Sequence, residues 1–540
     1  MSSASPIRAA DALARRLYAA GCRHAFGMPG GEVLTIVDAL EAAGITFVLC
    51  KHENAAGFMA EAAWHQSGAP GIMVATIGPG ILNGINSVAN AQQDRVPLIV
   101  LSGCVDAADA ETYTHQVLDQ QAVLRPITKA SFRLDAAAAH VMADKAVGIA
   151  LEGRPGPVHI DVPISVADTS VTATPPAPRA AAAATAPAGA ALQTAREWLA
   201  GAKRPVMIVG VDAMNEGAGA EVTAFAERFN IPVITSYKAK GLLDERHALA
   251  LGGAGLSPLA DGVLVPFVQQ ADLILCVGYD PIEMRPGWRG IWDPRETNVI
   301  DITAEPNHHY MHQAGLNIIA ECAASLAAIG DGLPSQDTWP KGEIAATKSA
   351  LATAFPTDSE WGPAAIVDTC AQVLPDDVIA TADSGAHRIL LSQMWACTQP
   401  RGLLQSSALC TMGCALPLAI GAAVCAPDRT VVSFSGDAGF LMIAGELSTA
   451  AELKIKPIFI VFVDASLALI ELKQRQRQLR NAAVDFDLHD FAAMGQAFGG
   501  AGHTVRSREE LTAALQAAQT ADTFTVIACM IERGAYDGII

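Results

Sequence analysis

Short apolar runs recur along the chain and alternate with longer stretches of small and apolar residues at helical spacing. Runs rich in Val, Ile and Phe that are bounded by Gly, Pro, Asn or Asp are typical of buried parallel strands. Strands that alternate with helices form parallel sheets covered on both faces, so the expected fold class is α/β, with three doubly wound parallel-sheet domains. The sequence predicts strands at 46–49, 71–76, 98–101, 206–209, 273–277, 378–381, 430–434, 457–463 and 524–528.

Two changes in composition divide the chain. The first segment contains several prolines and a run of alanines, and the second is again mixed and polar. Neither has a periodic apolar pattern, so both are interpreted as linkers. We therefore expect a first domain over 1–168, a central domain over 191–332 and a third domain over 359–540, with linkers at 169–190 and 333–358.

Two acidic residues follow two of the predicted strands directly. Asp437 lies in a Gly-Asp-Ala-Gly turn after the run 430–434, and Asp464 follows the run 457–463. Ligands of open α/β sheets bind at the carboxyl ends of the strands. Two oxygen ligands there suit Mg²⁺, which proteins usually share with substrate phosphates. For either Asp alone, a helix N-cap is the simpler interpretation.

Composition and charge narrow the classes of function. Of the 540 residues 51% are hydrophobic, 17% are charged, and the formal net charge is −19. A strongly negative chain disfavours nucleic acid and anionic membranes as partners, and neither is expected. The eleven cysteines lack a zinc-binding spacing, and the first residues lack the apolar core of a signal peptide, so buried thiols in the cytoplasm are expected. The uncharged stretch 408–426 contains Gly and Pro and predicts a buried helix rather than a membrane span.

The first block carries two further features that chemistry could use. Glu53 lies just past the predicted strand 46–49 and before a helix of small residues, at a strand-to-helix corner, where a lone Glu is usually a first-turn acid. Gly78, Gly80 and Gly84 allow a ligand or backbone to approach closely. They match neither a phosphate-binding P-loop nor the Gly-x-Gly-x-x-Gly of dinucleotide sites.

Nine short motifs follow one another along the chain. They are Gly27-Met28-Pro29-Gly30, His52-Glu53-Asn54-Ala55-Ala56, Gly78-Pro79-Gly80, Arg125-Pro126-Ile127-Thr128-Lys129, Val277-Gly278-Tyr279-Asp280-Pro281-Ile282-Glu283, Asp383-Ser384-Gly385-Ala386-His387, Thr411-Met412-Gly413, Gly436-Asp437-Ala438-Gly439 and Leu469-Ile470-Glu471-Leu472-Lys473-Gln474. With these motifs in this order, the chain resembles over nearly its whole length the thiamine diphosphate-dependent enzymes of the acetolactate synthase group. That family has a pyrimidine-binding, a central and a diphosphate-binding domain, which agrees with the three predicted blocks.

The resemblance implies the chemistry of the catalytic residues. The Glu that matches Glu53 hydrogen-bonds a pyrimidine ring nitrogen of the cofactor and favours the imino tautomer that removes the thiazolium C2 proton. Gln116 matches a glutamine that points into the active site. Asp437, Asp464 and the backbone oxygen of Ser466 match the family's Mg²⁺ ligands, although Val463 stands where the family usually has Asn.

The resemblance also implies a set of residues that hold thiamine diphosphate. Met412 matches the bulky apolar residue that bends the cofactor, although core packing is the commoner role of Met. The carbonyl of Cys410 is then expected to face the pyrimidine amino group. The expected cofactor-binding residues are Pro29, Asn83, Ser384, Gly385, Ala386, His387, Cys410, Met412, Gly436, Asp437, Ala438, Gly439, Ala468 and Leu469.

The departures from the family pattern gather on the substrate side. His115 and Val117 flank Gln116 where the family more often has Phe and Glu, and they put a reaction between two pyruvate molecules in doubt. The flavin-binding synthases carry an arginine-rich signature that is absent here, so FAD is not expected, and Arg285, Arg289 and Arg295 are interpreted as solvent-facing. The predicted substrate pocket comprises Met28, His115, Val117, Leu467 and Leu472.

The expected activity is decarboxylation of a 2-oxo acid with transfer of the acyl-anion equivalent to a second carbonyl. Simple decarboxylation, cleavage of a 2-hydroxyketone or diketone by a lyase or hydrolase, and a non-catalytic cofactor-binding homologue remain alternatives. In the family the pyrimidine domain of one subunit meets the diphosphate domain of another. A homodimer or homotetramer with active sites at the subunit interface is therefore expected, and the small residues at 55–63 and 413–426 suit close helix contacts there.

Overall fold

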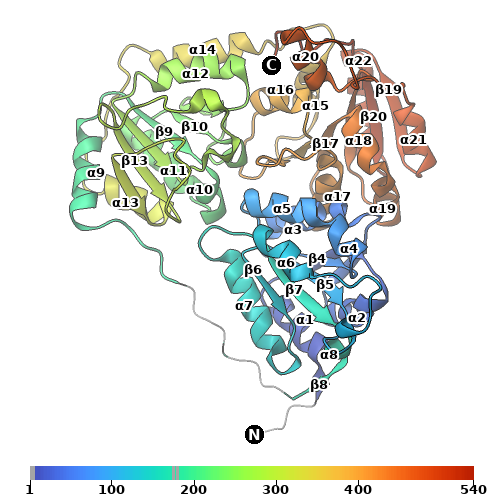
Figure 1. Cartoon of the computed structure of the whole chain (residues 1–540). Helices are drawn as coiled ribbons and strands as arrows, with labels where there is room; N and C mark the ends of the chain where they lie inside the picture. Colours follow the sequence, from blue (N-terminus) through green and yellow to red (C-terminus); the bar gives the residue numbers. More distant parts are fainter. Residues whose placement is uncertain (1–5, 173–176, 178–181) are drawn as a thin grey trace.

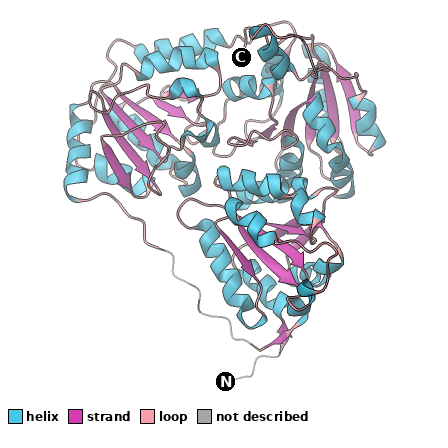
Figure 2. Cartoon of the chain, viewed as in Figure 1, coloured by secondary structure: helices cyan, strands magenta, loops and turns pink. Residues whose placement is uncertain are grey.

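Three six-stranded parallel sheets, each covered by helices on both faces, form the computed structural model, which describes residues 6–172, 177 and 182–540 (Figures 1 and 2). The predicted fold class is confirmed. Part of the first predicted linker lies outside the described residues, and a helix, α14 (Glu343–Ala354), occupies part of the second. A short antiparallel ladder pairs β1 (Ile7–Arg8) with β8 (Ser170–Val171).

The N-terminal sheet has the strand order β3-β2-β4-β5-β7-β6. Strands β4 and β5 lie in its middle and are buried along their whole length, which explains their uninterrupted apolar sequence. The strands are β2 (His24–Met28), β3 (Thr46–Leu49), β4 (Gly71–Ala75), β5 (Leu98–Cys104), β6 (Ala130–Arg133) and β7 (Val158–Pro163). The main helices are α1 (Ala9–Ala19), α2 (Leu34–Ala42), α3 (Glu53–Ser67), α4 (Pro79–Asn83), α5 (Ile85–Gln93), α6 (Gln120–Leu124), α7 (Ala139–Leu151) and α8 (Ile164–Asp168).

The central sheet has a different order, β11-β10-β9-β12-β13-β14. Counted from the first strand of its own domain this is 3-2-1-4-5-6, the order of dinucleotide-binding folds. The strands are β9 (Pro205–Val209), β10 (Val233–Thr235), β11 (Ala250–Gly253), β12 (Leu273–Val277), β13 (Asn298–Thr303) and β14 (Leu316–Ile319). The helices are α9 (Gly189–Gly201), α10 (Val211–Glu216), α11 (Gly219–Phe229), α12 (Pro258–Val268) and α13 (Cys322–Gly330).

The C-terminal sheet, β16-β15-β17-β18-β20-β19, repeats the connectivity of the N-terminal one, because both read 2-1-3-4-6-5 within their own domains. The strands are β15 (Ile379–Ala382), β16 (Leu403–Gln405), β17 (Val431–Gly436), β18 (Ile458–Val463), β19 (Ala501–Val505) and β20 (Thr525–Met530). The helices are α15 (Pro363–Val373), α16 (Ala386–Met394), α17 (Ala415–Cys425), α18 (Asp437–Ile443), α19 (Leu447–Glu452), α20 (Ala468–Gln476), α21 (Phe491–Ala497) and α22 (Arg508–Thr520).

Helices α3 and α17 pack the N-terminal and C-terminal domains against each other within one chain (Figure 1). A Cβ atom at Gly421 of α17 would lie 2.6 Å from the carbonyl oxygen of Met59 in α3, so the close approach requires glycine. One hydrophobic core cluster runs across this contact. The small residues that we expected at a contact between subunits are thus already used inside the chain.

A buried lysine from the central domain reinforces the same junction. The ammonium of Lys238 lies 2.8 Å from Asp94 and 3.2 Å from Glu61, both on the N-terminal domain. Asp94 also accepts the backbone N–H groups of Ser407 and Ala408 at 2.9 and 2.8 Å. The loop that leads to Cys410 and Met412 is therefore tied to both other domains.

No helix within the described ranges is both long and apolar enough to cross a membrane. The uncharged stretch 408–426 forms a loop followed by α17, a buried helix of eleven residues, as the sequence predicts.

Candidate active site

The two acidic residues predicted to bind a metal lie at the carboxyl ends of neighbouring strands. Asp437 is the first residue after β17, Asp464 follows β18, and these strands pair directly. Asp437 Oδ2 accepts the backbone N–H groups of Asp464 and Ala465 at 3.1 and 2.8 Å, and its Oδ1 accepts that of Ala438 at 2.8 Å. These bonds fix the carboxylate of Asp437 and tie the two strand ends together.

The carboxyl group of Asp464 is buried, has a raised pKa, and has one oxygen without a hydrogen-bond partner among the described residues. Burial, and then the charge of Asp437, raise the pKa of Asp464 to about 7. Its Oδ1 accepts the N–H of Ser466 at 3.2 Å, whereas its buried Oδ2 has no hydrogen-bond partner among the described residues. Over the described ranges no group of three or more His, Cys, Asp or Glu could hold a metal. Mg²⁺ would therefore take the two carboxylates, the Ser466 backbone oxygen, and phosphate or water oxygens.

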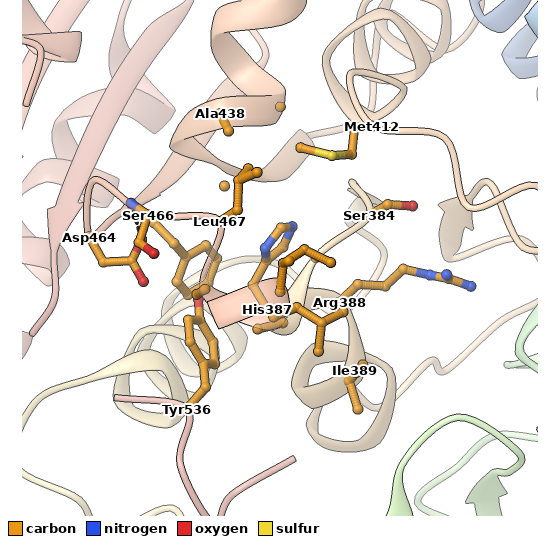
Figure 3. A pocket seen from close by; sticks show the side chains of 18 of the residues that line it. Ser384, His387, Arg388, Ile389, Met412, Ala438, Asp464, Ser466, Leu467 and Tyr536 are labelled. Carbon is orange, nitrogen blue, oxygen red and sulfur yellow. Dashed lines mark hydrogen bonds between the residues drawn. The ribbon is translucent and has the colours of Figure 1, made fainter. Parts of the chain in front are cut away.

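A cavity of about 350 Å³ opens beside this pair and gathers most of the predicted cofactor residues (Figure 3). His387 lies between the Asp464 and Ser466 side and the Met412 and Ser384 side. Of the predicted residues, those on its wall are Ser384, Gly385, Ala386, His387, Cys410, Met412, Gly436, Asp437, Ala438, Gly439, Asp464, Ser466, Leu467, Ala468 and Leu469.

Two further polar atoms in the cavity are buried and lack a hydrogen-bond partner in the described part of the chain. They are the hydroxyl of Ser384 and Nε2 of His387, whose ring stacks on Phe462 with centroids 5.3 Å apart. Burial lowers the pKa of His387 to about 3, so the ring is neutral and can donate or accept a hydrogen bond. Buried polar atoms without partners are uncommon in folded proteins. Here, beside the Asp437 and Asp464 carboxylates, they would fit a diphosphate.

Asp383 shapes the cavity without lining it. This buried carboxylate accepts the backbone N–H groups of Ser384 at 3.0 Å, Gly413 at 3.0 Å and Cys414 at 3.1 Å. A Cβ atom at Gly439 would stand 1.9 Å from Asp383 Oδ2. Asp383 thus holds the Met412 loop and the Ser384 turn together, and Gly439 is required where the helix that begins at Asp437 passes this carboxylate.

Glu53 is the first residue of α3, at the strand-to-helix corner that the sequence predicts. Its side chain is only 4% exposed, and its Oε2 accepts the amide of Asn83 at 3.0 Å. Gly80 leaves room for it, since a Cβ there would lie 3.2 Å from Glu53 Oε1 and 2.7 Å from Thr76 Cγ2. One carboxylate oxygen is therefore held by an amide, and the other faces glycine backbone.

Gln116 and His115 line a second cavity, of about 360 Å³, on the N-terminal domain. Gln116 has a left-handed backbone, with φ of 58°, and a Cβ at Gly78 would lie 3.2 Å from the Gln116 Cβ. The N–H of Gly78 is held by Gln120 Oε1 at 2.9 Å. The glycine turn singled out in the sequence therefore supports the segment that carries Gln116.

The predicted site residues of the N-terminal domain and those of the C-terminal domain do not line one common cavity within a single chain. The cavity beside Asp437 is lined by residues of the C-terminal and central domains and by none of the N-terminal domain. Met28 is half-buried at the end of β2, and Pro29, Asn83, His115, Gln116 and Val117 are exposed. Leu472 of the predicted substrate pocket is half-buried on α20 and does not line the cavity.

Sequence reasoning missed several residues of the cavity wall. Arg285, which we interpreted as solvent-facing, lines it from the central domain, and Arg388 and Lys473 line it from the C-terminal domain. Tyr536 reaches the wall from the C-terminal segment (Figure 3). The motif 469–474, which contains Lys473, pointed to that helix, but no local pattern distinguishes Arg285 from Arg289.

Three parallel sheets, a pair of strand-end carboxylates beside a cavity, and a buried Glu at a helix start define a thiamine diphosphate-binding enzyme. The N-terminal, central and C-terminal domain models of the thiamine pyrophosphate enzymes match residues 7–123, 192–329 and 383–529. The chain belongs to this family, and within it to the acetolactate synthase-like enzymes.

The similar proteins include several acetolactate synthases. The acetolactate synthase of Bacillus subtilis is 31% identical over 96% of this chain and 92% of its own length. The catabolic acetolactate synthase of Raoultella terrigena is 29% identical over 97% and 95%. The acetolactate synthase isozyme 1 large subunit of Escherichia coli is 31% identical over 84% and 81%.

Proposed function

We propose that the enzyme uses thiamine diphosphate and Mg²⁺ to decarboxylate a 2-oxo acid and to transfer the acyl-anion equivalent to a second carbonyl. The observation that carries the proposal is the pair Asp437 and Asp464, joined through backbone N–H groups at the mouth of a cavity with unpartnered polar atoms. The acetolactate synthases among the relatives support the carboligating reaction.

The chain's own residues divide the work. Asp437, Asp464 and the Ser466 carbonyl would hold Mg²⁺, and Ser384 and His387 would hold the diphosphate. Thiamine diphosphate, when bound, supplies the electron sink for decarboxylation. Glu53 would share a proton with a cofactor ring nitrogen through the oxygen that Asn83 leaves free. Arg285 and Lys473 give the cavity a positive rim suited to the carboxylate of a 2-oxo acid.

We also propose that two copies of the chain complete each site. Glu53 and Gln116 of one copy would face the cavity of the other. Large apolar side chains are exposed near both halves: Leu82 and Val117 on the N-terminal domain, Leu409 and Met442 on the C-terminal domain. Their burial against a second copy would stabilise a homodimer or homotetramer.

The central domain is proposed to hold no flavin. At its topological switch point, between β9 and β12, Arg154 of the N-terminal domain pairs with Asp212 at 3.3 Å and with Asp280 at 3.4 Å. A Cβ at Gly210 would lie 2.5 Å from the carbonyl oxygen of Gly278, so the two strand ends touch. Protein groups therefore fill the crevice in which folds of this order bind dinucleotides.

A reducing cytoplasm is proposed as the compartment, because all eleven cysteines are free thiols and nine of them are buried.

The test is carbon dioxide release and product identification with a panel of 2-oxo acids, with and without thiamine diphosphate and Mg²⁺. We expect turnover that needs both cofactors, and a product that joins two carbonyl compounds. An aldehyde as the only product would replace carboligation by simple decarboxylation. Turnover only of preformed 2-hydroxyketones or diketones would make the enzyme a lyase or hydrolase. Cofactor binding without turnover on any substrate would overturn the proposal.

A further inference from the structure

A carboxylate of the C-terminal domain holds the backbone that leads into Glu53. Glu446 lies in the short turn Ala444–Glu446 directly after α18, and its side chain is fully buried. Its Oε1 accepts the backbone N–H groups of Lys51 and His52 at 2.8 and 2.9 Å. Its Oε2 accepts the hydroxyl of Thr449 at 2.7 Å. Both oxygens of this carboxylate are therefore satisfied, and three donors fix its orientation.

The two residues that Glu446 binds immediately precede Glu53. His52 is the N-cap of α3, and its Nδ1 accepts the N–H of Asn54 at 3.1 Å. The start of α3 is thus set twice, locally by His52 and from across the domain contact by Glu446. Hydrogen bonds to an ionised acceptor are stronger than neutral ones, and burial makes their loss costly.

We propose that Glu446 is a positioning residue that holds the Lys51 and His52 backbone so that Glu53 is presented to the cofactor in one orientation. The inference rests on the role proposed for Glu53. It adds a link between the two half-sites of one chain, because Glu446 ends the same continuous segment, α18 and its following turn, that begins with the metal-site residue Asp437.

The neighbouring ion pair provides a matched control. Lys51 Nζ lies 2.8 Å from Glu452, whose side chain is 57% exposed. Glu452→Gln removes a charge from the same region and touches neither backbone N–H group. Glu446→Ala removes the acceptor, and Glu446→Gln keeps one oxygen that can accept from both N–H groups while its amide reaches Thr449.

The experiment combines hydrogen–deuterium exchange of the 50–56 segment in the cofactor-free protein with steady-state kinetics and thiamine diphosphate binding. For Glu446→Ala we expect faster exchange at residues 51 and 52 and a kcat lower by about a hundredfold, as for a misplaced catalytic group. KM and cofactor affinity stay within about twofold because neither ligand touches Glu446. Glu446→Gln should give intermediate exchange and kcat, and Glu452→Gln wild-type values.

Wild-type exchange and kcat in Glu446→Ala would overturn the inference, as would equal effects of Glu452→Gln. If Glu446→Ala does not fold, Glu446→Gln decides: identity with wild type in both readouts removes the positioning role. Glu53→Gln is measured in parallel. Full turnover in that variant would instead break the proposed function, whereas its inactivity beside an unaffected Glu446→Ala would reject only the positioning role.

Discussion

The N-terminal and C-terminal domains share one strand order, yet the carboxyl edges of their sheets carry different chemistry. The C-terminal edge brings together two carboxylates, a neutral buried His and glycine turns around one cavity. The N-terminal edge presents the buried carboxylate of Glu53 and a glycine turn, with exposed apolar residues nearby. One edge suits a metal and a diphosphate, and the other suits proton transfer to a ring. The topology fixes where a site lies, and the loop residues fix what it does.

The largest effects are expected from substitutions of Glu53 and Asp437. A change at the N-terminal edge should remove turnover alone, whereas a change at the C-terminal edge should remove both turnover and cofactor binding. Glu53→Gln should lower kcat by about 10²–10⁴-fold, the usual worth of a general acid or base, while thiamine diphosphate and Mg²⁺ still bind. Asp437→Asn should abolish turnover and also the Mg²⁺-dependent binding of the cofactor. Calorimetric titration beside steady-state kinetics distinguishes the two. The exposed residues Glu41 and Asp428 supply the controls Glu41→Gln and Asp428→Asn. Loss of cofactor binding in Glu53→Gln would contradict the separate roles expected for the two edges.

Mixing these two inactive variants tests whether the edges belong to different subunits. If each site takes Glu53 from one copy and Asp437 from another, random mixed dimers contain one intact site. Activity should then return to roughly a quarter of the wild-type value. Subunits are exchanged by dilution and reconcentration, and the mixture is assayed against each variant alone. No recovery despite exchange shown by differently tagged subunits would mean that each chain builds its own site.

Adding a side chain at Gly439, at the C-terminal edge, should weaken binding of the cofactor. Gly439→Ala would place a methyl group against Asp383, and overpacking of this kind costs about 1–3 kcal/mol. We expect thiamine diphosphate affinity to fall by about tenfold to a hundredfold. Gly445→Ala is the control, since a Cβ there meets nothing within 4 Å. Equal cofactor affinities in the two variants would show that Asp383 yields to the methyl group.

The positive rim of the cavity should matter for substrate more than for cofactor. Arg285→Gln is expected to raise KM for the 2-oxo acid by about tenfold, the worth of one charge-assisted hydrogen bond, with a smaller change in kcat. Arg289→Gln, on an exposed neighbour outside the cavity, should change neither constant. A fall in cofactor affinity without a change in KM would reassign Arg285 to the diphosphate.

The last effect concerns acid stability rather than activity and belongs to the N-terminal domain. Burial on α3 lowers the pKa of His65 from 6.5 to about 4. Between these values the unfolded chain binds a proton that the folded protein does not. Stability is therefore full above pH 6.5 and falls toward pH 4, by roughly 1.4 kcal/mol per pH unit. Thermal midpoints measured across this window should depend less on pH in His65→Gln, and His115→Gln, on an exposed residue, should leave the slope unchanged. An unchanged slope in His65→Gln would assign the acid sensitivity to other groups.

The local sequence pattern correctly predicted features that depend on a single strand or a single turn. The apolar runs before Asp437 and Asp464 form β17 and β18, and Glu53 begins α3. The local pattern did not predict which other elements these strands and helices contact. The small residues of α3 and α17 suited a close helix contact, but nothing local says that the contact lies within the chain. Arg285 and Arg289 look alike in sequence, and only the packing of the central domain brings Arg285 to the cavity.

The sequence by itself determined the α/β class, the positions of the chemically important strand ends, and the family, because each depends on residues close together in the chain. Only the tertiary structure decided that Asp437 and Asp464 end neighbouring strands, that Gly439 makes room for Asp383, and that Glu446 holds Lys51 across 395 residues. The physical reason is that hydrogen bonds and steric exclusion act over a few ångströms in space. Which distant segments come that close depends on how the sheets are ordered and how α3 packs against α17.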